Sequence, residues 1–226
     1  MIYTDLHTGR FISRPNRFIA HVEINGAVEV CHVKNTGRCR ELLVPGAKVY
    51  LDKIPNPDRK TKYDLVAVQK GDRLINMDSQ APNKVFHEYL LSGKYIEGIT
   101  LIRPETTYGA SRFDFYVETP ERRIFIEVKG VTLERDGVIL FPDAPTERGV
   151  KHLNELAAAM DAGYEAHAVF VIQMSDVKYF APNRETHPQF ADALKAAAER
   201  GVVVTALDCT VKPGVVDIKG PVPVRL

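Results

Sequence analysis

The sequence has few cysteines and no apolar run long enough to cross a membrane. Its three cysteines, Cys31, Cys39 and Cys209, are an odd number without dense spacing, which indicates reduced thiols in a cytoplasmic protein rather than a disulfide-stabilised one. A membrane-spanning helix needs about 20 apolar residues, and no stretch approaches that length. Residues 1–6 show no basic region followed by a long apolar run, so we expect no secretion signal.

The chain also lacks an excess of charge and several catalytic motifs. Its 30 Lys and Arg residues against 29 Asp and Glu residues leave a net charge of +1, so only a local basic patch could favour nucleic acid. No glycine-rich phosphate loop and no serine nucleophile elbow occurs, which excludes the classes that depend on them. Cys31, His32 and Cys39 lack the spacing of a zinc site. With 226 residues, the chain is long enough for one large domain or two small ones.

The first eighty residues have the pattern of a small β-barrel. The turn pair Asn25-Gly26 separates two alternating runs, which is a strong hairpin signal. A short helix is expected within residues 35–43, and strands are predicted over residues 17–24, 27–33, 48–54, 62–69 and 74–77. Five short strands in this length indicate a barrel such as the OB-fold, and we expect residues 1–80 to form an OB-like nucleic-acid-binding domain.

From residue 81 onward, helical and strand patterns alternate. Helices are predicted over residues 83–91, 147–162 and 188–200, and strands over residues 100–103, 112–118, 123–129, 166–173 and 202–207. Asn83 is the expected N-cap of the first helix. This order predicts an α/β domain with a mixed sheet over residues 81–226. The Pro- and Gly-rich residues 213–226 are expected to form an extended surface tail.

Asp114 and Glu127 lie in two alternating runs that a four-residue loop connects. If the loop pairs Glu118 with Arg123, the same register places Asp114 directly opposite Glu127, with Phe113 and Phe115 together on the other face. Facing carboxylates repel each other. A shared proton, a basic neighbour or a bound cation must therefore offset the repulsion.

A divalent metal ion is one of these possibilities. Carboxylate oxygens suit Mg²⁺ or Mn²⁺, which also accept water and phosphate oxygens as ligands. Lys129, on the same face as Glu127, could orient or deprotonate an attacking water. The alternative is a solvated pair that Arg112 offsets without metal, since Arg112 lies opposite Lys129 in this register.

Basic residues gather at two places in the sequence. The helix predicted at residue 147 begins with basic side chains, and a helix N-terminus with added positive charge suits phosphate. Residues 1–40 hold six basic and three acidic residues with interleaved Phe residues, which suits a nucleic-acid groove. In both places the alternative is a solvated basic surface. The expected nucleic-acid contacts are Arg14, Arg17, Arg38, Arg148, Lys151 and His152.

Asp114 followed by Glu127-Val128-Lys129 resembles the D…(D/E)xK signature of the PD-(D/E)xK nuclease superfamily. Arg112-Phe113-Asp114 stands where that signature has Pro-Asp. The superfamily often carries a further acidic residue on a helix before the sheet, and Glu88 matches that position. The resemblance implies a metal-dependent nuclease with Asp114, Glu127 and Glu88 as metal ligands and Lys129 as a further catalytic residue.

Over essentially its whole length, the chain also resembles the sugar fermentation stimulation protein family. The matching segments are residues 17–18, 35–38, 45–46, 108–109, 112–115, 126–129, 131–133, 141–149 and 151–153. This resemblance implies an OB-like domain followed by a nuclease-like domain, DNA binding, and a regulatory role in sugar (maltose) metabolism.

Together these patterns predict a DNA-binding protein that hydrolyses phosphodiester bonds with Mg²⁺ or Mn²⁺. The alternative is a non-catalytic DNA-binding regulator of sugar metabolism genes on a nuclease-like scaffold. A third possibility, sugar binding, has no supporting residue pattern. The sequence leaves open DNA versus RNA, strandedness, endo- versus exonuclease action, and the oligomeric state, a homo-oligomer included.

Overall fold

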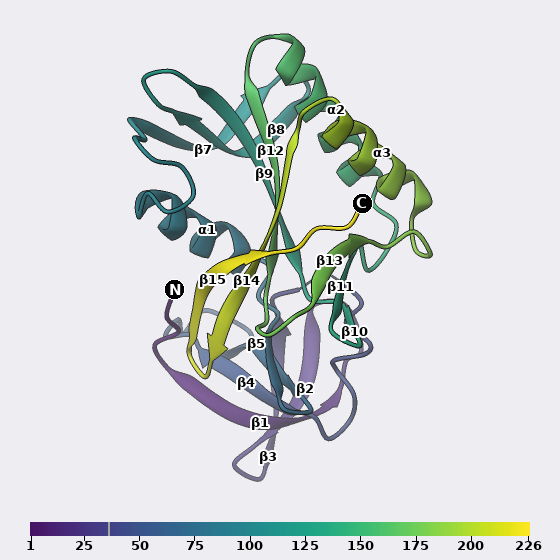
Figure 1. Cartoon of the computed structure of the whole chain (residues 1–226). Helices are drawn as coiled ribbons and strands as arrows, with labels where there is room; N and C mark the ends of the chain where they lie inside the picture. Colours follow the sequence, from purple (N-terminus) through teal and green to yellow (C-terminus); the bar gives the residue numbers. More distant parts are fainter. Residues whose placement is uncertain (36) are drawn as a thin grey trace.

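The N-terminal part of the chain is a closed β-barrel (Figure 1). The computed structural model describes residues 1–35 and 37–226, so Thr36, in the 35–38 segment of the family pattern, lies outside the described residues. The strands are β1 (Leu6–Ser13), β2 (Ile19–Ile24), β3 (Ala27–Val33), β4 (Lys48–Lys53), β5 (Tyr63–Lys70) and β6 (Arg73–Asn76). They form one sheet in the order β3-β2-β1-β4-β5-β6, and pairing of β3 with β5 closes the predicted OB-like barrel.

The hairpin of β2 and β3 forms as predicted. Asn25 and Gly26 have φ angles of 52° and 81°, and Ile24 pairs with Ala27 across the turn. Asn and Gly tolerate this left-handed backbone better than other residues, which explains the strength of the signal. The sequence pattern does not predict β1, where Gly9 lies so close to β2 that a Cβ there would be 2.5 Å from Val22.

The rest of the chain is an α/β domain around a six-stranded mixed sheet. Its strands are β7 (Leu101–Tyr108), β8 (Ser111–Glu118), β9 (Arg123–Val131), β12 (Glu165–Ile172), β14 (Val203–Lys212) and β15 (Val215–Val222). Their order is β15-β14-β12-β9-β8-β7, in which β12 runs parallel to β9 and β14 while the other pairs are antiparallel. One face packs against α1 (Ala81–Leu91), and the other against α2 (Glu147–Asp161) and α3 (Pro188–Glu199) (Figure 1).

Several predicted boundaries and elements differ in the structure. The expected surface tail is instead β15, an edge strand whose Val216 and Ile218 are buried. The described part of residues 35–43 contains a turn at Cys39 rather than a helix. A small sheet of β10 (Glu134–Arg135), β11 (Val138–Phe141) and β13 (Tyr179–Pro182) was not predicted, since its strands are only two to four residues long.

Buried polar side chains join the barrel to the α/β domain. Gln173, just after β12, donates hydrogen bonds to Asn76 Oδ1 (2.7 Å) and to the Asp78 carbonyl (2.9 Å). On the barrel side of this junction, Asp78 Oδ2 accepts a hydrogen bond from Tyr3 (3.1 Å) and forms an ion pair with Lys34 (2.8 Å). One apolar core is continuous from barrel strands to α2 and α3. None of the helices in the described part of the chain combines the length and apolarity that a membrane crossing requires.

Candidate functional site

The β8–β9 hairpin has the predicted register, and Asp114 lies where its regular pairing stops. Phe115 pairs with Ile126 and Glu118 with Arg123. At Asp114 a side-chain hydrogen bond replaces the backbone pairing: Asp114 Oδ2 accepts from the Val128 amide (2.7 Å). Phe113 consequently packs against Phe125 on the α2 side of the sheet, so the prediction that it shares a face with Phe115 is wrong.

Helix α1 supplies a second partner for Asp114. Asn83 Nδ2 donates to Asp114 Oδ1 (2.7 Å). Asn83 is therefore not the N-cap that its sequence position suggests; α1 begins at Ala81, with Gln80 at the N-cap and Pro82 in the first turn. The Asp114 carboxylate is thus held by the backbone of β9 on one side and by α1 on the other.

Glu127 is buried beside this carboxylate, with only 4% of its surface exposed. Its Oε1 accepts hydrogen bonds from His152 Nδ1 on α2 and from Lys129 Nζ on the same strand. Its Oε2 is buried and accepts no hydrogen bond within the described part of the chain. A buried carboxylate oxygen without a partner is costly, so this atom is suited to a ligand that supplies positive charge.

His152 belongs to this cluster rather than to a phosphate-binding surface. It is 4% exposed, and its Nε2 accepts a hydrogen bond from Arg148 Nε (3.3 Å). Since arginine only donates, the proton of the neutral imidazole must lie on Nδ1, which points to Glu127. The expectation that His152 contacts nucleic acid directly is therefore corrected: it positions Glu127, and the exposed Arg148 holds its ring from the other side.

The two carboxylates have opposite pKa shifts. Burial raises the pKa of Asp114, and the charge of Glu127 raises it further. Burial alone would also raise the pKa of Glu127, but hydrogen bonds from His152 and Lys129 outweigh it and lower that pKa. Glu127 is therefore the readily ionised member, and a cation would favour ionisation of Asp114 as well.

Glu88 does not join the pair. Its Oε2 accepts a hydrogen bond from the Met1 ammonium group (2.7 Å), and about half of its side chain is exposed. The α1 residue that reaches Asp114 is Asn83, five residues earlier. Among the described residues, no group of three or more His, Cys, Asp or Glu side chains is placed to hold a metal ion. A cation between Asp114 and Glu127 would take its remaining ligands from water or substrate.

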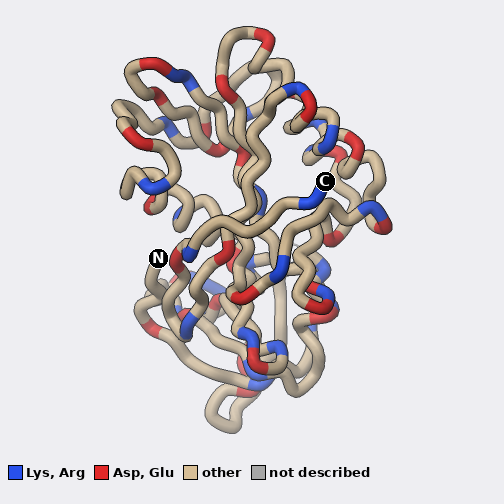
Figure 2. Tube along the Cα trace, viewed as in Figure 1, with Lys and Arg blue, Asp and Glu red and all other residues tan. Residues whose placement is uncertain are grey.

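A groove of about 880 Å³ lies between the barrel and the loop after β11, and four arginines line it. Arg17, Arg38 and Arg40 are exposed there and form no ion pair with a described carboxylate. Arg14 differs, because its guanidinium donates to the carbonyls of four residues, Arg17, Asn35, Gly37 and Arg38. Elsewhere acidic and basic residues are interspersed along the chain (Figure 2), so the groove is a local basic patch on a nearly neutral protein.

The other predicted contacts lie at the start of α2. Lys151 is exposed and donates to the Ala110 carbonyl (2.9 Å), with Glu155 3.8 Å away. Thr146 caps the helix by accepting a hydrogen bond from the Gly149 amide (3.0 Å). The sequence indicated Asn83 only as a helix cap and did not indicate Arg40 as a groove residue. His152 could have been recognised as buried, since it lies three residues after Gly149 and four before Leu156 on the buried stripe.

The architecture is thus that of an OB-like barrel joined to an α/β domain with a mixed sheet, and comparisons identify its family. The SfsA N-terminal OB domain matches residues 12–77, and the sugar fermentation stimulation protein RE domain matches residues 80–215. The chain belongs to the sugar fermentation stimulation protein family.

Full-length relatives agree with this assignment. A sugar fermentation stimulation protein homolog of Ruminiclostridium cellulolyticum is 58% identical over 226 residues, covering 100% of both chains. A homolog of Desulfitobacterium hafniense is 59% identical over 226 residues, covering 100% of this chain and 99% of the relative. The solved structure of Pyrococcus furiosus SfsA in complex with Ca²⁺ superposes with a TM-score of 0.89 at 30% identity, covering 100% of this chain and 98% of that one.

Proposed function

We propose that this protein is a divalent-metal-dependent nuclease that hydrolyses phosphodiester bonds in DNA. The observation that carries the proposal is the unpartnered, buried Glu127 Oε2 beside the Asp114 carboxylate. Two carboxylates with one oxygen left free fit a hard divalent cation such as Mg²⁺ or Mn²⁺. The Pyrococcus furiosus relative was solved in complex with Ca²⁺, which supports a cation site of this class.

The residues around the pair have distinct tasks in such a reaction. Asp114 and Glu127 would hold the cation, which supplies charge neutralisation and lowers the pKa of a bound water. Asn83 and the Val128 amide fix the Asp114 carboxylate, and His152 fixes Glu127. Preorganised ligands of this kind need no rearrangement when charge develops on the substrate.

Lys129 supplies the positive charge of the cluster. Its ammonium group donates to Glu127 Oε1, and its side chain is about one-fifth exposed. It therefore reaches the surface of the site, where it can contact a substrate phosphate or the attacking water.

The basic groove supports DNA as the polymer that reaches this site. Arg17, Arg38 and Arg40 present guanidinium groups to solvent along a groove of about 880 Å³. Arginine binds phosphate oxygens bidentately, and such contacts hold nucleic acid without regard to sequence. Arg14 supports the groove indirectly, because its hydrogen bonds fix the backbone of Gly37 and Arg38.

A cleavage assay tests the proposal. Wild-type protein should cut labelled single- or double-stranded DNA with Mn²⁺ or Mg²⁺ and not in EDTA. Asp114→Asn should abolish cleavage, while Asp217→Asn, the same change at an exposed position on β15 of the same sheet, should leave it intact. Cleavage by Asp114→Asn at the wild-type rate, or none by wild type across substrates and metals, would remove the nuclease proposal.

A second candidate is a DNA-binding regulator of sugar metabolism genes without cleavage. The observation that favours it is the lack, among the described residues, of a cluster of three or more metal-ligating side chains. Binding assays separate the two functions. A pure binding protein should hold DNA equally well in EDTA and in Mn²⁺, and Asp114→Asn should not change its affinity.

A further inference from the structure

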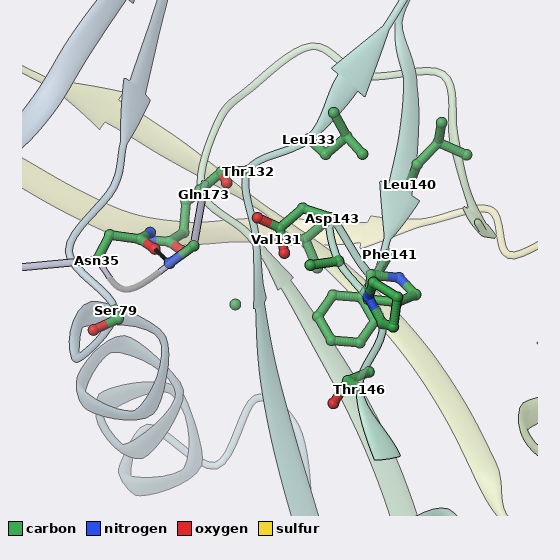
Figure 3. Close-up of a pocket in the computed structure, with 15 residues that line it drawn as sticks. Asn35, Ser79, Val131, Thr132, Leu133, Leu140, Phe141, Asp143, Thr146 and Gln173 are labelled. Atoms are coloured by element: carbon green, nitrogen blue, oxygen red, sulfur yellow. Dashed lines mark hydrogen bonds between the residues drawn. The ribbon is translucent and has the colours of Figure 1, made fainter. Parts of the chain in front are cut away.

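A second cavity, of about 340 Å³, opens at the junction of the two domains (Figure 3). Asn35, Ser79 and Gln173 lie on one side of it, and Asp143 and Phe141 on the other. Its floor includes Gly130, the residue that follows Lys129 on β9, so the two Cα atoms are about 3.8 Å apart. The cavity therefore borders β9, the strand that carries Glu127 and Lys129.

The polar lining of this cavity is rich in hydrogen-bond acceptors. Asp143 is exposed and forms no ion pair with a described residue. Gln173 is 2% exposed, and both of its amide hydrogens are used at the domain junction. Its Oε1 accepts no hydrogen bond from the described residues, and it lies 2.8 Å from where a Cβ on Gly130 would be. Because Gly130 has no side chain, this oxygen and Pro82 of α1, whose Cγ would be 2.5 Å from the same Cβ position, both lie close to the Gly130 backbone.

The chemistry of the lining excludes a phosphate group as the preferred occupant. None of the described residues that line the cavity is Lys or Arg. A carboxylate and an amide oxygen would instead bind a group that donates hydrogen bonds. The proline and phenylalanine residues of the 141–145 segment add apolar surface, which suits a flat ring.

The cavity adjoins the basic groove. Gly37, Ala144 and Pro145 line both spaces. A Cβ on Gly37 would lie 2.8 Å from Asp143 Oδ2, so the backbone at this shared wall lies close to the carboxylate. Arginines thus line the groove on one side of these shared residues, and hydrogen-bond acceptors line the cavity on the other side.

We propose that this cavity binds one unpaired nucleobase, preferentially guanine, of a nucleic acid whose phosphates lie in the arginine groove. Guanine presents N1–H and N2–H₂ donors on one edge, and a carboxylate can accept from both. Proteins that bind an unstacked base read its Watson–Crick edge in this way. The inference rests on the proposed function for the presence of nucleic acid, but it requires no cleavage.

Binding of short oligonucleotides tests it. We would measure fluorescence anisotropy with full-length protein in EDTA, using single-stranded DNA pentamers that carry one guanine or one hypoxanthine, which lacks the 2-amino group. Wild type should bind the guanine pentamer about five- to tenfold more tightly. Asp143→Asn should bring the ratio close to one.

Matched variants separate base recognition from charge. Burial raises the pKa of the Cys39 thiol to about 12, and the charges of Glu41 and Asp143 both add to the rise, so both acids lie near the same wall. Glu41→Gln removes the same charge as Asp143→Asn and should keep the guanine preference. Arg38→Ala should weaken both pentamers equally and also keep it.

The outcomes distinguish this inference from the proposed function. If wild type binds both pentamers equally, or if Asp143→Asn keeps the full preference, the nucleobase site is overturned while the nuclease proposal stands. If neither pentamer nor longer DNA binds, both are overturned. Loss of preference in Asp143→Asn alone, with retained affinity for hypoxanthine, supports the site.

Discussion

His152 Nδ1 donates a hydrogen bond to Glu127 Oε1, and both side chains are buried. This contact ties α2 to β9 at the strand that carries the candidate site. It also explains why a histidine occurs on the buried stripe of a helix, between Gly149 and Leu156. The same contact leads to the first prediction.

Replacing His152 with alanine should destabilise the fold and weaken the site together. Glu127 would lose one of its two partners, and a buried group left unsatisfied costs about 1–3 kcal/mol. We expect the free energy of unfolding in urea to fall by about that amount and the affinity for Mn²⁺ to fall as well. Lys151→Ala, one residue earlier on the exposed side, is the control and should change stability by less than about 0.5 kcal/mol. Equal stability of the two variants would contradict this role.

Asp114→Asn should separate stability from cation binding. The folded-state pKa of Asp114 is raised above its ordinary value of 3.8, so its ionisation costs stability as the pH rises through the folded-state pKa. Without metal at neutral pH, Asp114→Asn should therefore be at least as stable as wild type, and the difference should vanish at low pH. Thermal unfolding scans check this. Mn²⁺ should raise the melting temperature of wild type and leave that of the variant unchanged; an equal rise in both would place the cation elsewhere.

Cation binding should depend on pH because the ion competes with the Asp114 proton. Since the pKa of Asp114 is raised, this competition should begin at a higher pH than for an ordinary carboxylate. The lowered pKa of Glu127 keeps that group ionised through the same range. We expect the Mn²⁺-induced stabilisation to be larger at pH 8 than at pH 5, measured by calorimetric titration or thermal shift. A constant effect over this range would show that Asp114 is not a ligand.

The groove arginines should differ in what they do. Arg38→Ala should lower the affinity for DNA of any sequence and reduce the salt dependence of log K by about one unit, because one phosphate contact is lost. Arg14→Ala should lower stability by about 1–3 kcal/mol, because its guanidinium bridges the carbonyls of four residues. Salt titrations and urea unfolding of both variants distinguish the roles. If Arg38→Ala lowered the stability as much as Arg14→Ala, Arg38 would have a structural role instead of binding phosphate.

Much of the fold could be predicted because local signals agree with tertiary packing. The Asn25-Gly26 turn and the four-residue loop after Glu118 set two hairpin registers that the structure shows. Strands β1, β10, β11, β13 and β15 were missed because they are short, edge-located or interrupted by Gly and Pro. Such strands form through partners distant in sequence rather than through their own propensity.

The candidate site was predicted only where it lies within one hairpin. Asp114, Glu127 and Lys129 come together because β8 and β9 are neighbours in the sequence. The contributions of α1 and α2 depend on how each helix rotates against the sheet, which the sequence does not specify. That rotation brings Asn83 to Asp114 in place of Glu88, and His152 to Glu127.

Gln173 joins the α/β domain to the barrel side through buried hydrogen bonds to Asn76 and Asp78, both of which also bond to Tyr3, and the two parts share an apolar core. Neither domain has a complete hydrophobic core of its own. Separating the chain near residue 80 would therefore expose apolar surface on both fragments. The polypeptide should consequently melt in one concerted step. A DNA strand that contacts both the groove and the carboxylates would then have to adapt its own conformation, because the two domains would not close around it.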